Sequence, residues 1–164
     1  MDFLTFVHVV LSLVGIGAGF VMVWGFLASK HVDGWTQIFL ATTVATSMTG
    51  FLFPVHQFLP SHAVGMLSLI ALAIALLARY RFGLAGVWRR TYVATAVVAL
   101  YFNVFVLIVQ LFLKLPPLKA MAPTQSEPPF LLAQLAALVL FAFLGIRSAI
   151  TFRSEPPRHG ETVR

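Results

Sequence analysis

Long apolar segments divide this chain more clearly than any other feature of its sequence. Five of them reach or approach the roughly 20 residues that an α-helix needs to cross the hydrocarbon core of a bilayer. They cover residues 3–28, 35–53, 62–78, 92–113 and 130–150. Lipid cannot hydrogen-bond to an exposed backbone, so a spanning segment has to satisfy its N–H and C=O groups as a helix or in a closed barrel. The pattern predicts an all-α membrane protein, a five-helix transmembrane bundle formed as one domain over residues 1–152.

The composition supports lipid as the solvent. Of the 164 residues, 60% are hydrophobic and 10% are charged, whereas a soluble domain has roughly 45–50% apolar and about 25% charged residues. The opening Met1-Asp2-Phe3 has no basic segment, and the apolar run after it is longer than a signal-peptide core, so we expect no cleavable signal. Cysteine is absent, which excludes disulfides, thiolate metal sites, iron–sulfur clusters and cysteine nucleophiles.

The basic residues predict an orientation. The formal net charge is +6, which in a soluble protein would suggest nucleic acid. Here the basic residues lie between apolar segments, so we interpret them as topology signals and expect no nucleic-acid partner. With five spans, nine basic residues fall on one side, and only Lys114 and Lys119 fall on the other. The positive-inside rule places the larger group in the cytoplasm. It predicts a multi-pass protein of the cell inner (plasma) membrane, with its N-terminus outside and its C-terminus inside.

The segments between the predicted helices carry three further expectations. Residues 54–61 read as a tight turn at the membrane surface, with a re-entrant excursion as the alternative. The prolines of residues 114–129 favour an extended, stiff path. Residues 153–164 are polar, and we expect a disordered cytoplasmic tail.

Several kinds of chemistry have no support in the sequence. No Asp, Glu, Lys or Arg lies in the middle of any predicted span. Ion-coupled carriers and channels with charged filters usually need such a group, so their absence argues against both. The sequence also has no glycine-rich phosphate loop, no HExxH motif and no nucleophile elbow. It assigns no catalytic residue.

Small and polar residues share one face of the first predicted helix, as steps of three and four residues show. They are His8, Ser12, Gly15 and Gly19. Such a face should contact other helices and not lipid. The second predicted helix has a similar stripe, formed by Thr42, Thr46 and Thr49.

Other polar residues reach a similar depth near the non-cytoplasmic side. Asn103 and Gln110 lie seven residues apart on one face of the fourth predicted helix, and Gln134 lies about one turn into the fifth. The candidate ligand-binding residues are therefore His8, Ser12, Asn103, Gln110 and Gln134. The candidate metal ligands are His8, His56 and His62, because neutral imidazoles bind haem iron, copper or zinc. The alternative is that these groups only form hydrogen bonds between helices, worth about 0.6 kcal/mol each.

The opening FVHVVLSLVGIGAG, with a histidine before a glycine-rich turn, resembles CopD-like and SirB-like membrane proteins. That resemblance covers about twenty residues and implies haem or copper as a cofactor. Four further stretches resemble family signatures of small polytopic inner-membrane proteins of bacteria. They are TSMTGFLFPVHQFLPSH, ARYR, ALYFNVFVLIVQ and APTQSEPPF. This second resemblance implies no particular activity.

Three hypotheses follow. The leading one is a membrane protein that binds a metal, haem or small ligand in a polar pocket open to the non-cytoplasmic side, among the first, second, fourth and fifth spans. The second is a small haem- or quinone-dependent membrane oxidoreductase. The third is a structural or assembly subunit, whose partners beyond the lipid bilayer would be other membrane subunits or further copies of the chain.

Overall fold

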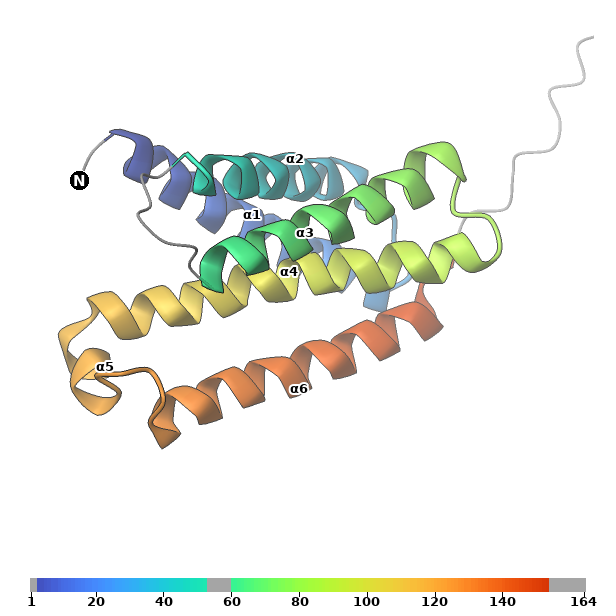
Figure 1. Ribbon diagram of the computed structural model, residues 1–164. Coiled ribbons are helices and arrows are strands. Elements are labelled where there is room, and N and C mark those ends of the chain that lie inside the picture. The colour runs from blue at the N-terminus through green and yellow to red at the C-terminus, as the bar shows by residue number, and fades with distance from the viewer. Residues whose placement is uncertain (1–2, 53–59, 154–164) are drawn as a thin grey trace, which may run out of the picture.

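The computed structural model describes residues 3–52 and 60–153, with side chains from residue 63 onward in the second part (Figure 1). All regular secondary structure in these two stretches is helical. The five long helices are α1 (Phe3–Leu27), α2 (Asp33–Gly50), α3 (Pro60–Leu76), α4 (Val87–Lys114) and α6 (Pro128–Thr151). A π-helical turn, η1 (Leu77–Arg81), continues α3, and a short helix, α5 (Pro116–Met121), lies between α4 and α6.

Within the described residues, four helical segments are long and apolar enough to cross a membrane. They are α1, α3 together with η1, α4 and α6. This finding is consistent with a membrane protein. The helix that falls short is α2, whose 18 residues include Asp33 and five threonines. The second predicted span, residues 35–53, is therefore present as a helix, but its own hydropathy does not mark it as one that crosses lipid.

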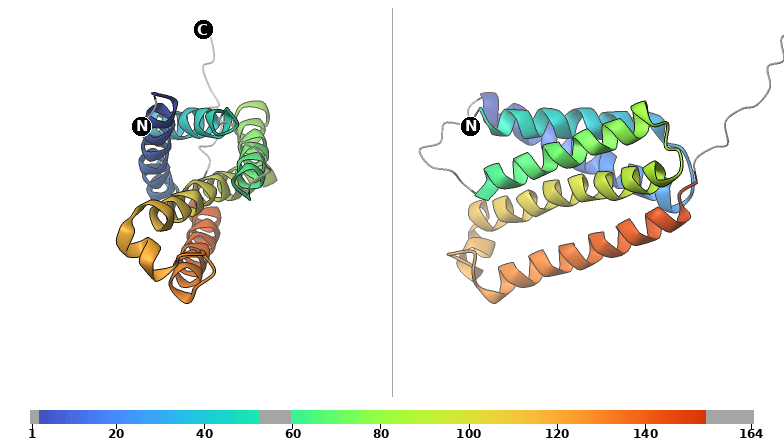
Figure 2. Two further views of the ribbon diagram at one scale, coloured as in Figure 1. Left: turned by 60° about the vertical axis from the view of Figure 1, so that its left-hand side comes forward. Right: turned by 45° about the vertical axis from the view of Figure 1, so that its right-hand side comes forward.

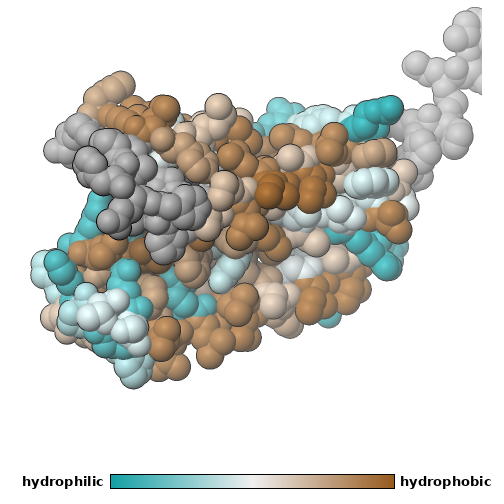
Figure 3. All heavy atoms as spheres, viewed as in Figure 1, coloured by the Kyte–Doolittle hydropathy of each residue, from teal (hydrophilic) through white to brown (hydrophobic). Residues whose placement is uncertain are grey.

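The long helices run back and forth, and each is antiparallel to the next (Figure 1). Viewed toward the bundle end, α1, α2, α3 and α4 form the four sides of a square, and α6 packs outside it against α4 (Figure 2). The centre of the bundle is apolar and includes the fully buried Met22, Phe39, Val93 and Leu100. On the face seen in Figure 3, apolar residues dominate along the helices, and hydrophilic residues gather toward the two ends.

The predicted small face of α1 contacts other helices. A Cβ atom added to Gly15 would lie 2.9 Å from Thr42 Oγ1 on α2. One added to Gly19 would lie 2.5 Å from Leu100 Cδ1 on α4 and 2.9 Å from Phe39 Cδ2 on α2. Both glycines are needed because only a hydrogen atom fits where the helices approach so closely.

The extended path expected for residues 114–129 is wrong for Pro116–Met121, because these six residues form α5. Pro116 and Pro117 begin this helix, where a proline costs no hydrogen bond and its fixed φ suits a helix start. After α5, the Glu127 carboxylate accepts hydrogen bonds from Thr124 N (3.1 Å), Thr124 Oγ1 (2.9 Å) and Ser126 N (3.1 Å). Glu127 is also the residue that immediately precedes α6.

Candidate functional site

A cavity of about 530 Å³ lies among α1, α2, α3 and α4, toward the end of the bundle where α1 and α3 begin and α2 and α4 end. Each helix places side chains around it. The polar lining residues are Thr5, His8, Ser12, Thr46, Ser47, Ser68, Asn103, Gln110 and Lys114. The remaining lining residues are Val9, Leu13, Gly50, Phe51, Val64, Gly65, Phe102, Val106, Leu107, Leu111 and Leu115. Mostly apolar walls with a few polar groups are typical of small-molecule sites, and the volume lies within their usual range.

Two residues that line this cavity have a hydroxyl group that lacks a hydrogen-bond partner and is not itself exposed to the cavity. Thr46 on α2 is 8% exposed and Ser68 on α3 is 3% exposed, and the Oγ atoms of both are buried. A buried polar group without a partner is costly, and such groups in native proteins usually have a specific reason. Asn103 on α4 lies in the same wall, and its side-chain amide donates to Thr43 Oγ1 at 3.1 Å.

The imidazole of His8 is oriented by Thr49 on α2. His8 Nδ1 lies 2.9 Å from Thr49 Oγ1. The same hydroxyl oxygen lies 2.8 Å from the Ala45 carbonyl oxygen and 3.1 Å from the Thr46 carbonyl oxygen. This contact holds the imidazole against α2.

The cavity gathers most of the predicted ligand-binding residues. His8, Ser12, Asn103 and Gln110 all line it. Gln134 lies elsewhere, on α6, where its amide donates to the Phe105 carbonyl at 3.3 Å. The fourth side of the cavity is α3 and not the last long helix, so our expectation that the fifth predicted span contributes differs from the observed lining.

The predicted metal site cannot be assembled from the residues that are described. His56 lies outside them, and so does the side chain of His62 at the start of α3. Within the described part of the chain, no group of three or more His, Asp or Glu residues could hold a metal ion. Haem or metal ligation by His8, His56 and His62 therefore stays a prediction.

Sequence reasoning missed five polar residues of the cavity lining, which are Thr5, Thr46, Ser47, Ser68 and Lys114. The threonine stripe that contains Thr46 predicts a packing surface, and Lys114 in the sequence indicates only topology. Ser68 carries no signal of its own, because a single serine in an apolar helix usually donates to its own backbone. Only the approach of α3 to the other helices shows that it lines a cavity.

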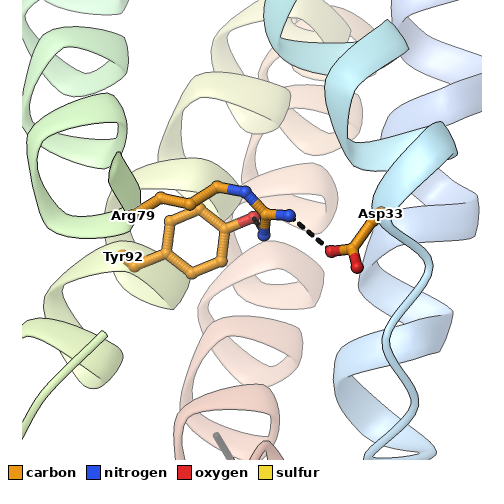
Figure 4. Close-up of polar contacts among 3 residues, drawn as sticks. All are labelled: Asp33, Arg79 and Tyr92. Atoms are coloured by element: carbon orange, nitrogen blue, oxygen red, sulfur yellow. Dashed lines mark hydrogen bonds and ion pairs between the residues drawn. The ribbon is translucent and has the colours of Figure 1, made fainter. Parts of the chain in front are cut away.

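A second polar cluster lies at the opposite end of the bundle and joins three helical segments (Figure 4). The Arg79 guanidinium, on η1, forms an ion pair with Asp33 at the start of α2 and donates to the Tyr92 hydroxyl on α4 at 3.4 Å. Tyr92 is 0% exposed, so its ring lies entirely inside the bundle. Because Arg79 bridges α2 and α4, this cluster is best explained as a structural tie.

No family model, curated protein or solved structure matches the chain. The resemblance of the opening segment to CopD-like and SirB-like proteins therefore stays a prediction. The functional conclusion depends on the geometry of the cavity.

Proposed function

We propose that this chain is a multi-pass membrane protein that binds a small, mostly apolar ligand in the cavity among α1, α2, α3 and α4. The observation that carries the proposal is the cavity of about 530 Å³ itself, which is lined by residues of all four helices and is mostly apolar. Apolar walls favour an apolar ligand, and a few hydrogen-bonding groups would orient it. Whether the ligand is stored, sensed or chemically changed is a separate question, and no catalytic role is assigned.

The proposal includes α2 as a membrane-spanning helix, which brings the number of spans to five. Its 18 residues extend about 27 Å, close to the thickness of the hydrocarbon core. Its hydropathy is low because of threonines and a serine, but Thr36, Thr43, Thr46 and Ser47 are buried within the bundle. In the part of α2 that follows Gln37, the exposed residues are Ile38, Ala41 and Met48, and all three are apolar. A helix that turns its polar side chains toward protein and its apolar ones outward can lie in lipid.

The charge distribution supports the proposed orientation. In the described residues, the end of the bundle where α3 ends and α4 begins carries most of the basic side chains, which are Lys30, Arg79, Arg81, Arg89, Arg90, Arg147 and Arg153. The other end carries Lys114 and Lys119. The positive-inside rule places the strongly basic end in the cytoplasm. The cavity then lies in the non-cytoplasmic half of the membrane.

Filling the cavity tests the proposal. Leu107 lines the cavity on α4, whereas Leu135 on α6 is exposed on the lipid-facing surface. We expect Leu107→Trp to prevent ligand binding and Leu135→Trp to leave it intact, since only the first side chain occupies cavity volume. The measurement is mass spectrometry of small molecules that co-purify with each variant in lipid nanodiscs.

Identical results for the wild type and both tryptophan variants would contradict ligand binding. If wild type, Leu107→Trp and Leu135→Trp carry the same small molecules in the same amounts, nothing specific occupies the cavity. Equal thermal unfolding temperatures of the two variants would show that a loss in Leu107→Trp does not come from misfolding.

A further inference from the structure

Lys114 gives the cavity its charge. It is the last residue of α4, it is exposed, and within the described lining it is the one Lys, Arg, Asp or Glu residue. Gln110 lies one helical turn earlier on the same face of α4, and it also lines the cavity and is exposed. The ammonium of Lys114 and the side-chain amide of Gln110 are therefore N–H donors that a ligand in the cavity can reach.

Neither carboxylate in the described part of the chain neutralises Lys114. The two acidic residues there are Asp33 and Glu127. Asp33 pairs with Arg79 at the opposite end of the bundle, and Glu127 accepts its hydrogen bonds within the turn before α6. Lys114 has no ion pair, and the Gln110 amide no hydrogen bond, with any described residue. The positive charge at the cavity is therefore available to a ligand.

Membrane topology does not account for a lysine at this place. Basic residues favour the cytoplasmic side, and in the proposed orientation Lys114 lies on the opposite side. Among the described residues of that end, only Lys119 is also basic, whereas most of the basic residues lie at the other end. A cation beside an apolar cavity on the non-cytoplasmic side is better explained by an anion that it binds.

The inner part of the cavity suits a hydrocarbon chain. From Lys114 back to Phe102, α4 extends about 18 Å toward the middle of the bundle. Val9, Val106 and Leu107 line the cavity along this distance. An ionic headgroup would lose its water at this depth without meeting an opposite charge, so the head of an anionic ligand has to stay near Lys114. Its chain then points from the membrane surface toward the bilayer centre, as the lipid chains of the same leaflet do.

We infer that the cavity binds an anionic amphiphile with a single hydrocarbon chain, such as the carboxylate of a fatty acid. Its head accepts hydrogen bonds from the Lys114 ammonium and the Gln110 amide, and its chain fills the apolar part of the cavity. The inference rests on the proposed ligand-binding function and names the class of ligand. It concerns binding alone and includes no covalent step.

Photoreactive probes test the headgroup and locate the chain. Three probes share one hydrocarbon chain with a diazirine at its far end, and they differ only in the head, which is a carboxylate, an alcohol or a trimethylammonium group. Each is titrated into phosphatidylcholine nanodiscs that contain the whole chain, at about pH 8, where a carboxyl group is ionised. The measurement is the mole fraction of probe in lipid that gives half-maximal labelling of inner cavity residues such as Phe102. We expect the carboxylate to reach it at about a tenfold lower mole fraction than the other two, the usual effect of a hydrogen bond to a charged group.

Unlabelled competitors define the ligand further. Decanoate and decyl phosphate should both displace the carboxylate probe, and the stronger of the two identifies the head as a carboxylate or a phosphate. Acetate should not displace it, because the hydrocarbon chain supplies the remaining binding energy. Displacement by acetate as effective as that by decanoate would overturn the inference, since the ligand would then be a small anion without a chain.

Substitutions at Lys114 test the role of its charge. Lys114→Gln should weaken binding of the carboxylate probe by about tenfold and leave the alcohol probe unchanged. Lys114→Arg should keep the preference for the carboxylate, because it keeps the charge. Lys114→Glu should reverse the preference, so that the trimethylammonium probe labels at a lower mole fraction than the carboxylate. A purely structural lysine would change all three probes together and would not produce this reversal.

Lys119→Gln is the matched control. Lys119 is exposed on α5 at the same end of the bundle, but it does not line the cavity. The substitution removes the same charge, so it should leave the labelling by every probe unchanged. An equal loss of carboxylate binding in Lys119→Gln and Lys114→Gln would mean that only the overall charge of this end matters, which would overturn the inference.

Two further results would overturn the inference without affecting the proposed function. One is half-maximal labelling by the alcohol and the carboxylate at the same mole fraction, and the other is unchanged carboxylate labelling in Lys114→Gln. In both cases, loss of labelling in Leu107→Trp would still show that the cavity holds a ligand. Failure of every probe to label a cavity residue would also reject the inference, and the mass spectrometry of the two tryptophan variants would then decide the proposed function independently.

Discussion

Single residues on α1 decide how closely it approaches its neighbours. Gly19 leaves no space for a methyl group, because Leu100 and Phe39 are both fully buried and have nowhere to move. Gly17, two residues earlier, is exposed and has no neighbouring atom within 4 Å of an added Cβ. Of the two glycines, only Gly19 lies on the face that the helical period predicts to contact other helices, and only Gly19 has such contacts.

Alanine substitutions should separate these two glycines. Gly19→Ala should lower the free energy of unfolding, because overpacking a core costs about 1–3 kcal/mol while alanine gains only about 1 kcal/mol in helix propensity. Gly17→Ala should leave stability unchanged or raise it slightly. Unfolding in mixed detergent micelles measures both. Equal stability of the two variants would show that the close approach at Gly19 is not rigid.

His8 shows how one residue depends on another helix. Its Nδ1 lies 2.9 Å from the Thr49 hydroxyl, which also lies 2.8 Å from the Ala45 carbonyl oxygen. The contact joins α1 to α2 beside the cavity. The orientation of the His8 ring therefore depends on a residue of another helix.

At the scale of an element, the connection between α5 and α6 is organised by one carboxylate. Partial desolvation by itself would raise the pKa of Glu127, but hydrogen bonds from the Thr124 N–H and hydroxyl and from the Ser126 N–H outweigh it. The net result is a pKa below the ordinary carboxyl value. The charged form is therefore the one that holds the turn before α6.

This turn should loosen in acid. A depressed carboxyl pKa contributes stability above the unfolded value of about 4.3, and that contribution is lost as the pH falls through the lower folded value. The backbone N–H chemical shifts of Thr124 and Ser126, followed by NMR, should titrate with a midpoint below that of a free glutamate. In Glu127→Gln the same signals should not titrate. A wild-type midpoint at or above the ordinary value would contradict this account.

At the scale of the whole molecule, the two ends of the bundle differ. One end carries the Arg79–Asp33 ion pair with Tyr92 and most of the basic residues, and the other carries the cavity. Because the helices alternate in direction, each connection has a predicted side of the membrane. If α2 crosses the membrane, the residues before it and the residues after it lie on opposite sides of the bilayer.

Cysteine labelling tests the topology directly, because the native chain has no cysteine. In intact cells, a membrane-impermeant thiol reagent should label Leu52→Cys and Ala120→Cys. It should label His31→Cys and Ala85→Cys only after the membrane is permeabilised. The unsubstituted protein should give no signal in either condition. Equal labelling of Leu52→Cys and His31→Cys in intact cells would mean that α2 does not cross the membrane.

Much of the helical architecture is determined by the sequence alone. Apolar runs near the length of a bilayer leave few alternatives to helices, and the predicted ranges overlap all five long helices. The small face around Gly15 and Gly19 and the depth of His8, Asn103 and Gln110 follow from the same helical period. These properties depend on residues that are close together in the chain, so the pattern of the sequence predicts them.

Only the tertiary structure decides which helices surround the cavity. Sequence reasoning chose the last long helix as one wall, but α3 occupies that position, and this brings Ser68 opposite α2 while Gln134 bonds to the backbone of α4. Likewise, Thr46 belongs to a stripe that predicts helix packing, and only the arrangement of the four helices shows that this residue lines the cavity. The physical reason is that helix period and hydropathy fix the depth and the face of a residue, whereas its partner depends on how separate helices pack against one another.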